Sequence, residues 1–373
     1  MAGAAALALG VGIGRFAYTP VLPAMQDAAG FGAAIAGWIA GWNYLGYLAG
    51  ALAASFIAAR ALRLEVLVAS IIASVITTAA MGFTTSIALW CALRFAAGLA
   101  SAGVLVLCSA IVLEALGRVQ RPHLMGAHFS GVGIGIALSG IVVALGAGLT
   151  DWRGLWFALA GVGAALAVLT LPLARRASQP GAPAASAAAQ AERFPGWVLV
   201  ASYFLEGLGY VVSGTFLVAV AKQMPAIGAS AELLWIVVGL AGVPSSPLWM
   251  RASQRWGAPA ALIAAHLVQA AGIVLPVLFD ALWVALVAAV CFGGTFMGIT
   301  AVAVSFGGRI SAQPARMIGL LTAAFGLGQM VGPVIAGWLA ERQGGFDVAL
   351  LLAAGAVVLG ALLLAAARAT CRA

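Results

Sequence analysis

The chain is a succession of apolar stretches of about 20 residues, the length that an α-helix needs to cross a bilayer. Hydrophobic residues make up 64 % of its 373 residues and charged residues only 8 %, whereas a soluble domain carries about 25 % charged residues. This composition excludes a water-soluble domain and a disordered chain. Four cysteines are too few for a disulfide-stabilised scaffold. Because the stretches lack the alternation of a membrane β-barrel, the sequence predicts an all-α membrane protein.

Twelve transmembrane helices are predicted from the apolar stretches and from the charged, proline and glycine residues that bound them. Their expected ranges are 4–25, 31–56, 64–83, 87–112, 124–149, 152–173, 197–221, 231–250, 257–279, 281–305, 317–340 and 346–367. The first range carries Arg15 in its middle and no basic segment before it. It is therefore interpreted as a transmembrane helix and not as a cleaved signal peptide.

The basic residues gather in alternate loops, and this pattern predicts the orientation. With a cytoplasmic N-terminus, the outer loops hold only Arg153, Lys222 and Arg342 of the eighteen lysines and arginines. The cytoplasmic loops and tail hold Arg60, Arg63, Arg118, Arg121, Arg175, Arg176, Arg193, Arg251, Arg255, Arg309, Arg316, Arg368 and Arg372. The positive-inside rule then predicts that both termini lie in the cytoplasm, with the protein in a bacterial inner membrane. The net charge of +8 is explained by topology, so no nucleic-acid partner is expected.

The four cysteines form no Cys-x-x-Cys pair, and such pairs are typical of redox and metal sites. No cofactor and no metal are therefore expected.

A polar segment rich in proline and alanine, residues 175–196, divides the chain into two halves, 1–174 and 197–373. It is predicted to be a flexible cytoplasmic linker. Five landmarks repeat across it at offsets of 192 to 197 residues: Tyr18 and Tyr210, Trp38 and Trp235, Phe95 and Phe292, Gly133 and Gly326, Gly161 and Gly355. Two pseudo-symmetric halves of six helices are typical of transporters that bind their substrate near the membrane midplane.

Three strings carry a family resemblance: Gly12-Ile-Gly-Arg-Phe-Ala-Tyr-Thr-Pro-Val-Leu-Pro23, Trp42-Asn-Tyr-Leu-Gly-Tyr-Leu-Ala-Gly50 and Leu93-Arg-Phe-Ala-Ala-Gly-Leu-Ala-Ser-Ala102. On them the chain resembles the major facilitator superfamily (MFS) and, over its full length, its YbfB/YjiJ-type branch. The resemblance implies the twelve-helix MFS fold, with the first, fourth, seventh and tenth spans lining a central cavity. The family's loop motif after the second span lacks its acidic residue here, since Ala54-Ser55 follows Gly50-Ala-Leu-Ala53.

Only Arg15, Arg94 and Glu206 are charged and clearly inside predicted spans. A charge at the bilayer centre costs about 2.5–3.5 kcal/mol on insertion scales, so all three are candidates for translocation. Glu206, the only carboxylate near the midplane, could load and release a proton in each transport cycle. Alternatively, Arg15 and Glu206 could form a permanent ion pair that clamps the two halves together.

The two arginines outnumber Glu206, which favours an anionic substrate. A guanidinium binds a carboxylate through two parallel hydrogen bonds, so a small organic anion is the predicted substrate. Arg94 also has a structural interpretation, in which it donates to backbone carbonyls beside Gly98.

Polar side chains on the same helix faces complete the candidate translocation site. Tyr18 lies three residues from Arg15, Asn43 four from Tyr47, and Glu206 four from Tyr210. These groups could orient a substrate or simply join helices by hydrogen bonds. Gln329 is a candidate substrate contact. His128 and His266 are interpreted as packed core histidines, and His128 is the better candidate of the two for a proton relay.

Three functions fit these features to different degrees. The prediction is a secondary transporter that works by alternating access and proton coupling. An exporter of lipophilic or cationic compounds, or a sensor that binds without transporting, remains an alternative. An intramembrane enzyme is not expected, because one central carboxylate and three scattered histidines supply no compact catalytic cluster.

Overall fold

A computed structural model describes residues 1–57, 60–121, 124–173, 194–225, 227–228 and 231–371. Most of the predicted linker, 175–196, lies outside these residues. The described chain is almost entirely helical: α1 (Ala2–Leu7), the π-helix η1 (Ala8–Ile13), α2 (Tyr18–Ala29), α3 (Ala33–Ser55), α4 (Arg60–Ala80), the short 3₁₀ turn η2 (Met81–Phe83), α5 (Ile87–Arg118), α6 (Met125–Gly146), α7 (Trp152–Thr170), α9 (Gly196–Gln223), α10 (Ala231–Trp256), α11 (Ala258–Leu278), α12 (Leu282–Ile310), α13 (Pro314–Gln343) and α14 (Asp347–Thr370).

The prediction of an all-α membrane protein is confirmed. Within the described residues, eleven helices are long and apolar enough to cross a membrane, counting Ala2–Ala29 as one. The twelfth long helix, α3, has 23 residues and no charged side chain. Trp42, Asn43, Tyr44 and Tyr47 stand among its alanine and glycine residues.

The first span differs from the continuous helix that the sequence predicts. It changes from α1 to the π-helix η1, passes through turns at residues 14–17 and resumes as α2. Gly10, Gly12 and Gly14 lie at this interruption, and glycine lowers helix stability by about 1 kcal/mol per residue relative to alanine. The interruption exposes backbone carbonyls in the middle of the bundle, where a side chain has to satisfy them.

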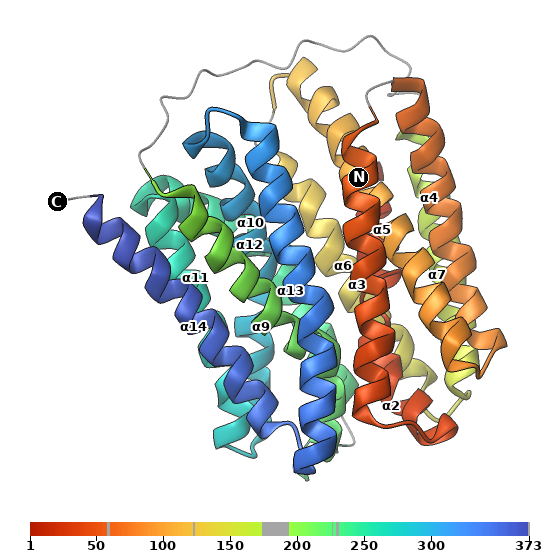
Figure 1. The fold of residues 1–373 in the computed structure, drawn as a ribbon. Helices are drawn as coiled ribbons and strands as arrows, with labels where there is room; N and C mark the ends of the chain where they lie inside the picture. The colour runs from red at the N-terminus through yellow and green to blue at the C-terminus, as the bar shows by residue number, and fades with distance from the viewer. Residues whose placement is uncertain (58–59, 122–123, 174–193, 226, 229–230, 372–373) are drawn as a thin grey trace.

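The helices form two groups that lie side by side (Figure 1). The group from α1 to α7 occupies one side of the bundle and the group from α9 to α14 the other. The two groups are joined where α3 packs along α13 and where α6 packs along α10. Helix α2 also packs on α9. Both ends of the described chain lie at the same end of the bundle (Figure 1).

Small residues allow several of these helices to approach closely. A Cβ added at Gly131 of α6 would lie 2.1 Å from the carbonyl oxygen of Ala4 on α1. One added at Gly37 of α3 would lie 2.2 Å from the carbonyl oxygen of Pro333 on α13. Both distances are far below van der Waals contact, so a larger residue at either position would push two helices apart.

We expect Gly131→Ala to lower the melting temperature of the purified protein, because α1 and α6 must separate to admit the methyl group. Overpacking of this kind costs about 1–3 kcal/mol, which corresponds to a loss on the order of 5 °C. Tryptophan fluorescence during heating in detergent measures it. Gly161→Ala on α7 is the matched control, since no atom lies within 4 Å of its added Cβ. Equal effects of both substitutions would contradict the packing argument.

Candidate functional site

Arg15 lies at the interruption of the first span, in the interior of the bundle. Its side chain is 5 % exposed. The Cζ atom of its guanidinium lies 4.0 Å from the ring centre of Tyr47, 4.9 Å from that of Tyr44 and 5.3 Å from that of Phe16. Its Nε and one terminal nitrogen have no hydrogen-bond acceptor among the described residues. Arg15 is thus a buried cation with unused donors, held by aromatic rings.

Arg94 on α5 stabilises the interrupted backbone of the first span. It is 3 % exposed, and its terminal nitrogens donate to the carbonyls of Gly14 at 3.0 Å and Arg15 at 2.5 Å. Asn43 on α3 donates to the carbonyl of Arg94 itself at 2.8 Å. These bonds agree with the structural interpretation of Arg94, but the acceptors belong to the first span and not to the backbone beside Gly98.

Glu206 lies inside the second group of helices, in a polar network between α9, α11 and α12. It is 1 % exposed. Its Oε1 accepts from the Gln269 amide at 2.8 Å, and Gln269 in turn accepts from the Thr295 hydroxyl at 2.8 Å. Its Oε2 has no hydrogen-bond partner and lies 3.8 Å from Nε2 of His266. Nδ1 of that histidine is 2.8 Å from the carbonyl oxygen of Leu262.

The two central charges therefore do not pair. Glu206 points toward His266 and Gln269 in its own group of helices, and Arg15 lies among the rings of Tyr44 and Tyr47. The alternative of a permanent Arg15–Glu206 ion pair is not realised in this structure. An unpaired arginine and a separate carboxylate remain in the membrane interior, where each would be costly without a role.

The two arginines should respond oppositely to the same substitution. We expect Arg94→Met to lower the melting temperature by on the order of 5–10 °C, because it leaves two buried carbonyls unbonded at about 1–3 kcal/mol each. Arg15→Met should leave the melting temperature unchanged or raise it, since it removes buried donors that bond to nothing. Heating both variants in detergent without ligand measures this. A large loss in Arg15→Met would show that Arg15 is needed for folding.

The other predicted residues fall into three places. Gln329 on α13 donates to the Tyr210 hydroxyl, which joins α13 to α9. Tyr18 donates to the carbonyl of Ala36 at 3.2 Å, and its ring centre is 5.3 Å from Cζ of Arg94. His128 lies apart from this group, because its Nε2 is 3.0 Å from the Ser109 hydroxyl.

The partners of Glu206 were not predicted from the sequence. His266 and Gln269 are three residues apart on α11, the spacing at which two side chains share a helix face, so this signal was present. Thr295 on α12 gave no signal, because a lone threonine in an apolar helix usually bonds to its own backbone, as Thr295 also does to Cys291 at 2.6 Å.

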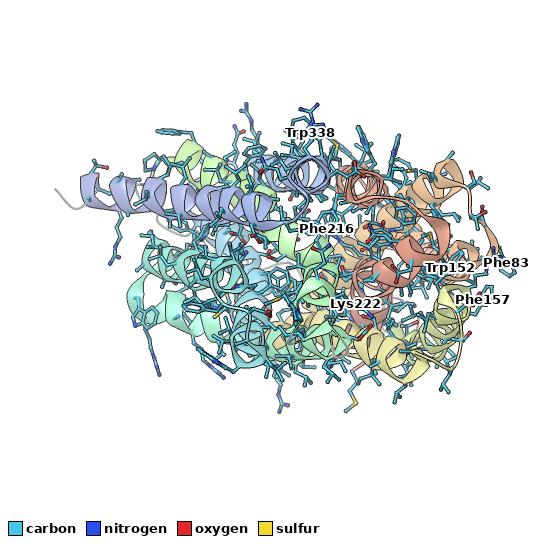
Figure 2. All side chains as sticks on the ribbon, turned by 90° about the horizontal axis from the view of Figure 1, so that it is seen from below. Phe83, Trp152, Phe157, Phe216, Lys222 and Trp338 are labelled. Carbon is cyan, nitrogen blue, oxygen red and sulfur yellow. The ribbon has the colours of Figure 1, made fainter. Side chains whose placement is uncertain are left out.

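A separate cavity of about 430 Å³ lies near Lys222, which is labelled in Figure 2. Asp27 and Asp151 line it together with Lys222 and Glu232, whose charged atoms are 2.7 Å apart. In the first span its lining begins only at Pro20, beyond Arg15. None of the predicted site residues lines it, so it is a separate feature.

The family described as "Uncharacterised MFS-type transporter YbfB" matches residues 7–365. The chain belongs to this family. It is accordingly a multi-pass membrane protein of the MFS transporters, and the predicted resemblance is confirmed. No curated protein matches the chain significantly.

Solved structures of MFS transporters share its fold. The nucleoside transporter NupG is 14 % identical with a TM-score of 0.73, over 98 % of each chain. A D-xylose–proton symporter is 17 % identical with a TM-score of 0.70, over 97 % of this chain and 95 % of its own. A bacterial homologue of the human lysosomal transporter Spinster, in an inward-facing and occupied conformation, is 17 % identical with a TM-score of 0.68, over 100 % and 95 %. At these identities the likeness establishes the fold alone.

Proposed function

We propose that the protein is a secondary active transporter that moves a small organic anion together with protons across a bacterial inner membrane. The observation that carries the proposal is the unpaired state of Arg15, whose buried donors have no acceptor among the described residues. A buried cation of this kind is costly to the apo protein, and an incoming anion would remove the cost. A guanidinium favours a carboxylate because its two parallel N–H groups match the two oxygens.

The proton site in this proposal is the pair of Glu206 and His266. One proton on the pair gives it no net charge, the state that a buried site accommodates most readily. Gln269 bonds to Glu206 through an amide that can stay in place in either protonation state. The D-xylose–proton symporter has the same fold, so proton coupling is known in at least one structural relative.

Alternating access would be carried by the two halves, 1–174 and 197–373, moving about the Arg15 site where they meet. Packing links Arg15 to the Glu206 network, because Phe16 follows Arg15 and Phe296 follows Thr295 in the chain. The ring centres of Phe16 and Phe296 are 6.0 Å apart. The charge distribution of the loops favours both termini in the cytoplasm.

The test is uptake of a radiolabelled carboxylate by proteoliposomes under an imposed pH gradient. We expect accumulation above the external concentration when the outside is acidic, and equilibration when a proton ionophore is added. Liposomes without protein report passive entry of the neutral acid. Gradient-driven movement of lipophilic cations alone would favour a drug exporter, and carboxylate binding without movement would favour a sensor.

A further inference from the structure

All five tyrosines of the chain lie in the interior of the bundle. Tyr18 is beside Arg94, and Tyr44 and Tyr47 are beside Arg15. Tyr203 and Tyr210 lie on α9 of the other group of helices, and each is at most 3 % exposed. Tyrosine in a membrane protein is usually enriched at the lipid–water interface. Membrane anchoring therefore does not explain why tyrosines surround the two buried arginines.

Five aromatic rings of the second group of helices are nearly parallel to one another. This ring cluster consists of Tyr203, Tyr210, Phe292, Phe296 and Phe325. Tyr210 lies within 7–18° of the planes of Phe292, Phe296 and Phe325, with ring centres 5.4–6.2 Å apart. Tyr203 stacks on Phe325 at 4.3 Å and 12°. The cluster thus offers flat ring faces of one orientation, drawn from three helices.

Arg15 is connected to this ring cluster through the residue that follows it in the chain. Its neighbour Phe16 contacts Phe296, with ring centres 6.0 Å apart at 75°. The cation and the ring faces therefore belong to one site, formed where the two groups of helices meet.

The contact between α3 and α13 shows which residues of the site lie at the same height in the bundle. A Cβ added at Gly326 would lie 3.0 Å from the Leu48 side chain. The preceding residues, Tyr47 and Phe325, are therefore at the same level on facing helices. Each of the two residues is 9 % exposed, which is a larger fraction than for any other tyrosine or any other ring of the cluster.

We propose that the substrate is an aromatic carboxylate, which Arg15 binds through the carboxylate and the ring cluster binds through the aromatic ring. The inference rests on the proposed function and names its substrate class. Apart from Arg15, the polar groups here are few: the hydroxyls of the surrounding tyrosines and the Gln329 amide, whose Nε2 bonds to Tyr210 and whose Oε1 has no partner among the described residues. A sugar or another polyol would need many convergent hydrogen-bonding groups, whereas a flat ring with one anionic group needs one cation and a stacking surface.

Aromatic stacking separates this class from aliphatic acids of similar size. Parallel, offset rings attract one another beyond the burial of apolar area, because the positive edge of one lies over the negative face of the next. A saturated ring buries similar area without this attraction. The expected preference for an aromatic over a saturated ring is roughly 2- to 12-fold in dissociation constant.

The test is isothermal titration of the detergent-purified, full-length protein with benzoate, cyclohexanecarboxylate and acetate. We expect benzoate to bind about 2- to 12-fold more tightly than cyclohexanecarboxylate, and acetate most weakly. Phe296→Leu and Phe325→Leu should each bring the affinities for benzoate and cyclohexanecarboxylate closer to equal. Phe83→Leu is the matched control, because Phe83 is 75 % exposed and lies at the edge of the bundle (Figure 2).

The wild-type series decides the question even if the phenylalanine variants fail to fold. Equal or tighter binding of cyclohexanecarboxylate would overturn the aromatic preference while leaving an anion transporter in place. Failure of all three acids to bind would overturn both the preference and the proposed function. If both phenylalanine variants fold and the ratio of their benzoate and cyclohexanecarboxylate affinities is unchanged, the ring cluster is not part of the binding site.

Discussion

Glu206→Gln is expected to abolish proton-driven accumulation of substrate, to below about 1 % of the wild-type gradient-driven rate, while the protein still inserts and folds. Glutamine has nearly the same shape and can still bond to Gln269, so the network between α9 and α11 is preserved. It cannot carry a proton, and proton binding by an ionisable group is what couples transport to the gradient. Uphill uptake in proteoliposomes measures the loss.

Exchange across the membrane separates lost coupling from lost binding. In counterflow, with unlabelled substrate inside and labelled substrate outside, the Glu206→Gln variant should still exchange substrate. Asp347→Asn is the matched control, since it removes an exposed carboxylate at the start of α14. Full gradient-driven accumulation by Glu206→Gln would show that the proton is carried elsewhere.

The second large effect is expected at Arg15. Arg15→Gln should weaken carboxylate binding about 10- to 100-fold, because a charge-assisted hydrogen bond to a carboxylate contributes about 1.5–3 kcal/mol. Arg15→Lys should recover part of the affinity, since an ammonium keeps the charge but lacks the planar pair of donors. The rise of melting temperature with ligand concentration reports the dissociation constant of each variant.

Arg342→Gln is the control for this experiment, because Arg342 is exposed and packs over the Trp338 ring, with Cζ 4.2 Å from its centre. Its ligand-dependent stabilisation should equal that of the wild type. If Arg15→Gln binds carboxylates as well as the wild type does, Arg15 is not the anion-binding group.

The sequence was sufficient to predict the fold because a membrane restricts it so strongly. Stretches of about 20 apolar residues can only be helices in a bilayer. Their number and the family strings around Arg15, Asn43 and Arg94 led to the correct architecture. The interruption of the first span was missed, because a glycine-rich segment is compatible with either a continuous or a broken helix until its neighbours are known.

The charged residues of the candidate site can be singled out from the sequence, but their contacts cannot. Arg15, Arg94 and Glu206 were found because a charge inside a membrane span is rare. Which charge meets which partner depends on helix rotation and tilt, and these are set by packing that residue spacing does not encode. Arg94 therefore proved to be bound to backbone carbonyls, and Glu206 proved to face His266 instead of Arg15.

Proton-coupled transport of a carboxylate can be measured in proteoliposomes that contain a pH-sensitive dye, as proton movement after addition of a small aromatic carboxylate. The wild type is compared with Glu206→Gln, Arg15→Gln and liposomes without protein. We expect substrate-dependent internal acidification beyond the passive signal in the wild type, none in Glu206→Gln, and in Arg15→Gln a response only at correspondingly higher carboxylate concentration. A response in the wild type to lipophilic cations but not to carboxylates would contradict proton-coupled transport of a carboxylate.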